Sequence, residues 1–217
     1  MPDVLSTQSQ QLDNFLLVDH DGQPLGGLPT GRLIQIQGPP GVGKTTLAMA
    51  VATGVEDSIV LWVDGDFCLW VAAYAEAGWK IQEEMLVLTP PPDHRAQWLM
   101  DNLPTIEPEV GLIVIDRLEG VLDCEDAELL IQTLASVAFE RGPLILVVTG
   151  EYRSPSKRIN QSEAGNVLKT YARLGIRLPY QGRAELMYSR ITQVPKQVSF
   201  TYKSAIAKIL PPVDRIL

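Results

Sequence analysis

A glycine-rich segment between an apolar run and a helical pattern carries the strongest chemical signal in the sequence. Its residues follow the pattern G-x-x-x-x-G-K-[ST] and are Gly38, Pro39, Pro40, Gly41, Val42, Gly43, Lys44, Thr45 and Thr46. Glycines let backbone N–H groups close around a phosphate, and the helix that follows adds positive potential. Lys44 supplies a charge for the β- and γ-phosphates, and the Thr45 hydroxyl is a Mg²⁺ ligand. The segment therefore predicts a nucleoside triphosphate site. The alternative is a Gly/Pro-rich turn in which Lys44 and Thr45 occur by chance, but such a turn would not require a strand before it and a helix after it.

A magnesium ion held by a triphosphate also needs a carboxylate at the end of a neighbouring strand. Four apolar residues precede Asp116 in the run Leu112–Asp116, which places its carboxyl group at the edge of a sheet where ligands bind in such folds. Asp116 is therefore predicted to orient a water bound to Mg²⁺. The alternative is a helix-capping acid, which is common at strand ends.

Hydrolysis requires one further group, which activates the attacking water. The run Ile59–Asp64 is followed by Gly65 and Asp66, so two carboxylates lie two residues apart. On a continuing strand they share a face, and Asp66 protrudes further towards the nucleotide. We expect Asp66 to be the catalytic base, with Asp64 in reserve; capping of the next helix is the alternative for both.

These residues must be positioned by alternating strands and helices. Buried strands are predicted at 33–37, 59–64, 85–88, 112–116 and 144–149, and helices at 44–53, 67–77, 94–102 and 126–141. This alternation predicts an α/β fold with a mostly parallel central sheet and helices on both faces. After Gly150, residues 154–165 read as a polar loop, and 170–178, 184–193 and 197–202 as antiparallel strands. We expect one domain over 1–217, with 1–25 partly extended.

Composition excludes several classes of protein. With 46% hydrophobic and 20% charged residues, the chain of 217 residues is neither disordered nor rich enough in long apolar runs to span a bilayer. Cys68 and Cys124 do not form a disulfide framework, and the N-terminus lacks a secretory signal, which indicates a cytoplasmic protein without membrane partners. The net charge of -8 is unevenly divided: residues 1–150 carry six Lys/Arg against 22 Asp/Glu, and residues 151–217 carry 12 against four.

The sequence resembles the RecA-type recombinase ATPases, including the archaeal RadA and RadB proteins. The similarity covers GGLPTGRLIQIQGPPGVGKTTLAMAVA (26–52) with its Walker A loop, VLWVDGDFCLWVAAYAEAGW (60–79), LIVIDRLEGV (112–121) and AGNVLKTYARLGIRL (164–178). The resemblance implies a RecA-like P-loop fold with antiparallel strands at its C-terminal end. It also implies ATP and Mg²⁺ as ligands, a hydrolysing ATPase core, and action in DNA recombination and repair.

The resemblance also carries roles to single residues. Asp66 falls on the family's catalytic Glu, with a side chain one methylene shorter. Glu151 falls at or next to the residue that senses the γ-phosphate, and an acid there repels phosphate unless Arg153 takes over the sensing. Arg117 replaces the small hydroxyl residue that usually follows the metal-site acid. An aromatic after the catalytic acid stacks on adenine in the family; Trp70 or Tyr74 would do so here, with a plain core role as the alternative for both.

The family's second DNA-binding loop corresponds to residues 153–164, RSPSKRINQSEA. Arg153, Lys157 and Arg158 provide long cations for a phosphate backbone, and Asn160 an amide for sugar or base edges. No aromatic is interleaved for base stacking. This predicts contact with single-stranded DNA, against the alternative of an ordinary solvated loop.

Two functions remain open at this point. The first is a slowly hydrolysing recombination and repair ATPase that self-associates or joins a RecA-family partner, with Lys169, Arg173 or Arg177 reaching into a neighbour's site. The second is a nucleotide-gated adaptor without a DNA role, similar to the KaiC-like ATPases or to an accessory subunit. The acidic body and the short first DNA loop, 118–128, favour the second.

Overall fold

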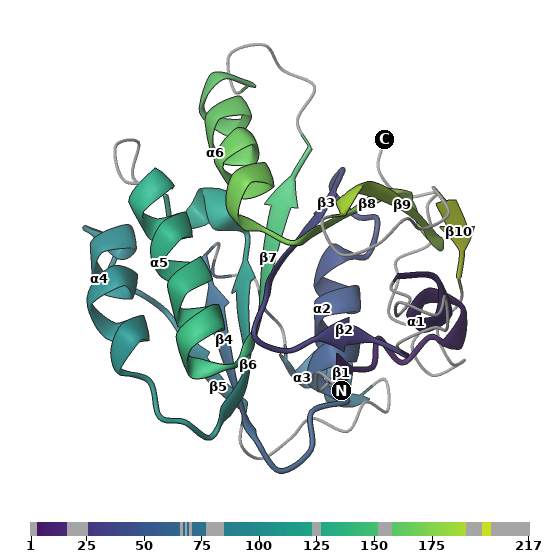
Figure 1. Cartoon of the computed structure of the whole chain (residues 1–217), viewed down its shortest axis with the longest axis horizontal. Helices are drawn as coiled ribbons and strands as arrows, with labels where there is room; N and C mark the ends of the chain where they lie inside the picture. The colour runs from purple at the N-terminus through teal and green to yellow at the C-terminus, as the bar shows by residue number, and fades with distance from the viewer. Residues whose placement is uncertain are drawn as a thin grey trace.

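An eight-stranded sheet organises the molecule (Figure 1). The computed structural model describes residues 4–16, 26–65, 67, 69, 71–76, 85–122, 127–151, 158–189 and 197–200. The strand order is β10-β9-β8-β3-β7-β6-β4-β5. The strands are β3 (Leu33–Gly38), β4 (Ile59–Asp64), β5 (Met85–Leu88), β6 (Val110–Asp116), β7 (Leu144–Gly150), β8 (Leu174–Tyr180), β9 (Arg183–Ser189) and β10 (Gln197–Ser199).

Parallel pairing holds the six strands from β8 to β5 together, whereas β9 and β10 are antiparallel. The central strands β3, β6 and β7 are buried along nearly their whole length, and β6 and β7 are almost entirely apolar, as expected of strands that are covered on both faces. We refer to β8, β9 and β10 as the antiparallel wing. The predicted fold class, a mostly parallel sheet with antiparallel strands at the C-terminal end, is confirmed.

Helices cover both faces of the sheet (Figure 1). One face packs against α2 (Lys44–Ala52), together with α1 (Gln10–Leu16) and Tyr74 of α3 (Val71–Glu76). The other face packs against α4 (Arg95–Asn102), α5 (Ala127–Arg141) and α6 (Arg158–Tyr171). The two hydrophobic clusters therefore lie on opposite sides of one sheet, and the helices fix the strands that carry the site.

The N-terminal segment contributes a small structure of its own. Strand β1 (Val4–Leu5) pairs antiparallel with β2 (Leu28–Pro29), and helix α1 follows β1. The Asp13 carboxylate accepts hydrogen bonds from the backbone and hydroxyl groups of Thr7 and from the Ser6 hydroxyl. No helix in the described ranges is long and apolar enough to cross a bilayer.

The register of the parallel strands aligns their carboxyl ends. Asp64 of β4 pairs with Asp116 of β6, and Gly38 of β3 pairs with Gly150 of β7. We call these four residues and the turns that follow them the carboxyl edge. In parallel sheets of this kind, ligands bind at that edge. The fold therefore brings together residues that are more than 100 positions apart in the chain.

The structure corrects the sequence prediction at two places. Residues 158–165 belong to helix α6 rather than to a polar loop, and that helix continues to Tyr171, where a strand was expected to begin. Ala164, Leu168 and Ala172 are buried at intervals of four, which is a helical spacing that a polar composition concealed. Strand β8, predicted as antiparallel, pairs antiparallel only with β9 and is parallel to β3 on its other side.

The second correction concerns the helix predicted over 67–77. Among the described residues it is limited to Val71–Glu76, and Phe67 has a left-handed backbone with φ of 57°. A helix cannot include such a residue, because right-handed helical φ values are negative. Phe67 instead lies in the turn after β4.

Candidate nucleotide-binding site

The glycine-rich segment forms the turn between β3 and α2. Strand β3 ends at Gly38 and helix α2 begins at Lys44, while Gly41 and Gly43 have φ values of 77° and 94°. Such left-handed conformations favour glycine, which explains these two positions. A side chain at Gly38 would place its Cβ 2.4 Å from the Leu178 carbonyl oxygen. The turn therefore has the strand, loop and helix arrangement that a phosphate-binding loop requires.

Lys44 lies at the centre of the charges on the carboxyl edge. Its Nζ atom donates a hydrogen bond to the Pro39 carbonyl oxygen at 2.8 Å. Burial lowers the pKa of Lys44, and the positive charge of Arg117 lowers it further, whereas Asp116, Glu119 and Glu151 raise it. A partly desolvated cation among these acids is suited to neutralise phosphate charge.

Thr45 and Asp116 are brought together although they are 71 residues apart. The Thr45 hydroxyl donates to Oδ1 of Asp116 at 3.3 Å. Burial raises the pKa of Asp116 to about 6, and the charge of Asp64 adds to this, while the Thr45 hydrogen bond, Lys44 and Arg117 oppose it. Oδ2 of Asp116 is buried and has no hydrogen-bond partner among the described residues. A hydroxyl and a carboxylate with an unused oxygen are hard donors that fit Mg²⁺.

The turn after β4 contains the acids expected to activate water. Oδ2 of Asp64 accepts the Leu69 backbone N–H at 2.8 Å, and the Gly65 N–H donates to the Asp116 carbonyl oxygen at 3.0 Å. Asp64 therefore holds the turn after β4 in place; its partner Leu69 precedes α3, so the bond is not a cap of that helix. Asp66 lies outside the described residues, so its role as the base stays a prediction.

Glu151, at the end of β7, is held by an arginine of the antiparallel wing. Nη2 and Nε of Arg177 contact the two carboxylate oxygens at 2.7 and 3.2 Å, and Nη1 of Arg177 lies 3.4 Å from Glu185. This fork neutralises an acid that would otherwise repel a phosphate. The cation that was expected for this purpose, Arg153, lies outside the described residues. From the sequence, Arg177 was expected to act only by reaching into the site of a neighbouring subunit.

Sequence reasoning missed two residues that join the turns of the carboxyl edge. Arg95 of α4 donates to the carbonyl oxygens of Gly65 and Gly120, and its guanidinium lies 4.7 Å from the centre of the Phe67 ring. Glu119 accepts the Gly150 N–H at 2.8 Å. The position of Glu119, three residues after Asp116, was the only signal for it in the sequence.

Arg117 connects β6 to the 3-10 helix η2 (Leu118–Gly120) in a strained conformation. Its φ of 70° and ψ of 88° lie in the left-handed half of the Ramachandran plot, where a non-glycine residue costs on the order of 1–3 kcal/mol. A Cβ at Gly65 would lie 2.6 Å from the Arg117 carbonyl oxygen. The two turns are thus packed backbone to backbone beside Asp116.

The residues expected to contact DNA are only partly placed. Arg153 and Lys157 lie outside the described residues. Arg158 and Asn160 belong to the first turn of α6, not to a loop.

Of the two aromatics considered for adenine, Tyr74 is 8% exposed and belongs to the core, as its alternative predicted, and Trp70 lies outside the described residues.

Comparisons with known proteins show the family and the fold of the chain. The model of the RecA N-terminal domain matches residues 3–129. "Protein RecA" of Ectopseudomonas oleovorans is 34% identical over 128 residues, which are 58% of this chain and 34% of the relative. "Protein RecA" of Wolinella succinogenes is 35% identical over 121 residues, 55% of this chain and 32% of the relative. The chain thus spans about a third of the length of these relatives.

A solved structure is similar over more of the chain. The crystal structure of the RadB recombinase superposes with a TM-score of 0.68 and 19% sequence identity, covering 93% of this chain and 97% of that chain. At this identity the likeness concerns the fold. It extends over the antiparallel wing, which the family model does not reach.

Proposed function

The chain belongs to the RecA family, and from that premise we propose that it binds ATP with Mg²⁺, hydrolyses it slowly, and acts in DNA recombination or repair. One observation carries the proposal: the turn from Gly38 to Lys44 leads into a helix whose Thr45 hydroxyl lies 3.3 Å from the Asp116 carboxylate. A phosphate loop beside a metal-binding pair is the minimal equipment of a P-loop nucleotide site.

Each residue of the site has a distinct proposed role. Backbone N–H groups of residues 41–46 surround the phosphates, and the Lys44 ammonium, released from the Pro39 carbonyl oxygen, contacts the β- and γ-phosphates. Thr45 and Asp116 hold Mg²⁺, directly and through water. When bound, the ion neutralises phosphate charge that develops during transfer. Glu151, paired with Arg177, stands where the γ-phosphate is sensed.

Nucleotide binding tests the site. Lys44→Ala is expected to abolish binding of a fluorescent ATP analogue in the presence of Mg²⁺, because the main cationic contact is lost. Arg141→Ala provides the control, since Arg141 is a cation in the last turn of α5, bonded to the Pro104 carbonyl oxygen. Wild-type affinity in the Lys44→Ala protein would refute the site assignment.

The basic C-terminal part of the chain supports the proposed contact with DNA. Twelve of the 18 Lys and Arg residues lie in 151–217. Fluorescence anisotropy with a labelled single-stranded oligonucleotide at about 50 and about 200 mM salt measures the release of counterions. Binding whose salt dependence is reduced by replacing Lys157 and Arg158 supports the DNA role. No binding favours the nucleotide-gated adaptor instead.

Self-association is part of the same proposal, because RecA-type sites are completed by a neighbouring subunit. Light scattering during ATP turnover, with and without single-stranded DNA, tests it. Stimulated turnover together with assembly identifies a recombinase, and the absence of both identifies an adaptor.

A further inference from the structure

Arg95, at the start of α4, holds the turn after β4, which contains the acid predicted to activate water. Its Nη1 atom donates to the Gly65 carbonyl oxygen at 2.9 Å and also to the Gly120 carbonyl oxygen in η2. Its guanidinium carbon lies 4.7 Å from the centre of the Phe67 ring. Gly65 and Phe67 are the two neighbours of Asp66 in the sequence. Arg95 therefore contacts the chain on both sides of Asp66.

The turn after β4 lies directly beside the pair proposed to hold Mg²⁺. The Gly65 N–H donates to the Asp116 carbonyl oxygen at 3.0 Å, and a Cβ at Gly65 would lie 2.6 Å from the Arg117 carbonyl oxygen. The Thr45 hydroxyl is 3.3 Å from the Asp116 carboxylate. The position of this turn therefore sets where its side chains stand relative to Thr45 and Asp116.

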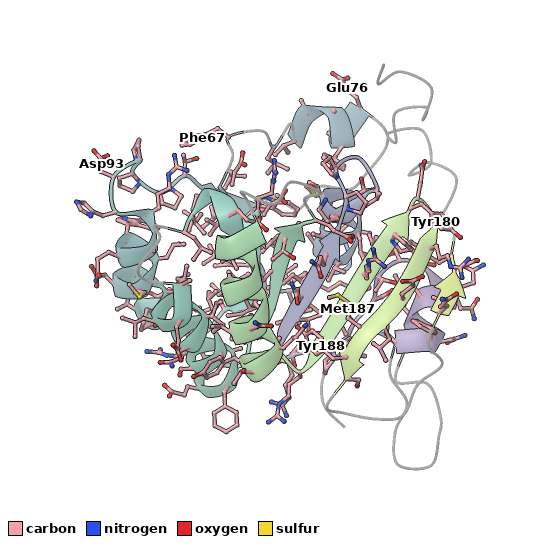
Figure 2. The ribbon with its side chains drawn as sticks, turned by 90° about the horizontal axis from the view of Figure 1, so that it is seen from above. Phe67, Glu76, Asp93, Tyr180, Met187 and Tyr188 are labelled. Carbon is pink, nitrogen blue, oxygen red and sulfur yellow. The ribbon has the colours of Figure 1, made fainter. Side chains whose placement is uncertain are left out.

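Phe67 gives the turn a strained and exposed residue that Arg95 stabilises. Its φ of 57° is left-handed, which costs free energy for a residue other than glycine, and 55% of it is exposed. A guanidinium over an aromatic ring is attracted by the electrons of the ring face. Figure 2 shows Phe67 on the same side of the molecule as Asp93, which lies just before α4.

The donors of Arg95 are directed to backbone rather than to an acid. Nη1 carries two hydrogens, so it can serve one carbonyl oxygen of the turn after β4 and one of η2 at the same time. In the described part of the chain, no carboxylate bonds to Arg95, and its buried Nε atom has no hydrogen-bond partner. A planar group that bridges two turns fixes their separation.

We propose that Arg95 is a positioning residue for ATP hydrolysis: it fixes the turn after β4 so that Asp66 reaches the attacking water. The inference rests on the proposed function and on the role predicted for Asp66. The water oxygen bonds to the γ-phosphorus, the bond to the β–γ bridging oxygen breaks and leaves its electron pair on ADP, and the water proton passes to the Asp66 carboxylate. Misplacement of such a group by about 1 Å can slow a reaction about 100-fold.

The decisive variant is Arg95→Met, which keeps a long apolar side chain but removes the charge and the donors. We expect single-turnover hydrolysis of γ-labelled ATP to slow about tenfold or more, with the dissociation constant for Mg²⁺ and a fluorescent ATP analogue changed less than about twofold. Arg95→Lys keeps a cation with N–H donors and is expected to hydrolyse within about threefold of wild type. Arg141→Met is the matched control, because Arg141 bonds to the Pro104 carbonyl oxygen at the surface, and it leaves both values unchanged.

The same substitution in an Asp66→Asn protein separates positioning from a general structural role. If Arg95 acts through Asp66, Arg95→Met slows hydrolysis by less than about twofold more once the carboxylate is absent. A residue that only stabilises the fold slows both proteins by the same factor.

Hydrogen exchange of the nucleotide-free protein gives a readout that does not depend on turnover. The Gly65 N–H is bonded to Asp116 and the Leu69 N–H to Asp64, so both amides report on the turn. Arg95→Met is expected to speed exchange at these two amides about tenfold or more, while the amides of β7 exchange as in wild type.

Four outcomes overturn the proposal. They are hydrolysis by Arg95→Met within about twofold of wild type, an equal loss in the Asp66→Asn protein, unchanged exchange at Gly65 and Leu69, and a wild type that binds ATP and hydrolyses none. Failure of the proposed nucleotide site gives a different result. In that case the wild type and Lys44→Ala proteins bind ATP equally poorly, while exchange at the turn still responds to Arg95→Met.

Discussion

The carboxyl edge and the antiparallel wing are built on one sheet but differ in how they relate to function. At the carboxyl edge, short-range motifs supply the chemistry: a glycine-rich turn, a hydroxyl and strand-terminal acids. The wing contributes long side chains that reach across strands, such as Arg177 to Glu151 and Tyr188 to Gln35. In Figure 2, Tyr180 lies on the wing, whereas Phe67 and Asp93 lie on the far side of the molecule. Among the described residues, the wing therefore meets the site through packing and side-chain bridges.

Two kinds of contact join these regions. The first is backbone packing, since Gly38 of β3 meets the Leu178 carbonyl oxygen of β8. The second is a buried chain of hydrogen bonds in which the Tyr188 hydroxyl donates to Gln35 and Gln35 donates to Thr149, just before Gly150. Tyr188 crosses β8 over Gly175, where a Cβ would lie 2.3 Å from its ring. The following predictions test these contacts, beginning with the largest effect.

Gly38→Ala is expected to have the largest effect on stability. The new Cβ would meet the Leu178 carbonyl oxygen at 2.4 Å and Val42 at 3.0 Å, and backbone cannot move aside as a side chain can. We expect a loss of about 3 kcal/mol or more in the free energy of unfolding, measured with urea. Gly165→Ala in α6 is the matched control, since a Cβ there meets nothing within 4 Å. It is expected to stabilise by up to about 1 kcal/mol, and equal effects at both glycines would contradict the packing.

Asp116→Asn is expected to stabilise the nucleotide-free protein at neutral pH. Because the pKa of Asp116 is about 6 in the folded protein and the ordinary pKa of an aspartate is 3.8, the folded protein binds this proton more tightly than the unfolded chain does. The cost of ionising Asp116 is absent below about pH 4 and complete above about pH 6, where it reaches up to about 3 kcal/mol. Unfolding in EDTA at a series of pH values should therefore show a gain for Asp116→Asn at pH 7.5 that disappears near pH 4. A gain that is independent of pH would contradict the shift.

Tyr188→Phe tests the buried chain of hydrogen bonds. Gln35 is 3% exposed, so the loss of the Tyr188 donor leaves its Oε1 atom unsatisfied, at a cost of about 1–2 kcal/mol in the free energy of unfolding. Tyr180→Phe is the control, because the hydroxyl of the exposed Tyr180 accepts its one described hydrogen bond, from Arg183, at the surface. Its expected effect is near zero. The contribution of the buried chain would be refuted if both variants were equally stable.

The ion pair between Arg177 and Glu151 is expected to contribute least. With side chains 39% and 33% exposed, solvent screens the pair. A double-mutant cycle with Arg177→Gln and Glu151→Gln should give a coupling energy of about 0.2–1 kcal/mol that falls at about 1 M salt. Coupling that persists in salt would show that the pair is shielded from solvent, contrary to the exposed fractions.

Much of the parallel half of the fold was predictable because its signals are local. The predicted strands at 59–64 and 85–88 match β4 and β5, and the predicted helix at 44–53 ends one residue after α2. Neighbouring residues alone identify the apolar runs of strands that are covered on both faces. The same holds for the glycine pattern at Gly38–Lys44. The region 158–171 was predicted wrongly, because a polar helix and a loop have similar compositions and only the burial of Ala164 and Leu168 distinguishes them.

The sequence alone determined that a glycine-rich turn follows one strand and that acids end two others, since backbone conformation and hydrophobic periodicity are properties of short segments. Only the tertiary structure decided which of these side chains meet. The packing of the sheet places Thr45 beside Asp116. The turn after β6 places Glu119 within hydrogen-bond distance of the Gly150 N–H, and β8 places Arg177 against Glu151. Such pairings depend on strand order and register, which are settled by packing across the whole sheet rather than by any one segment.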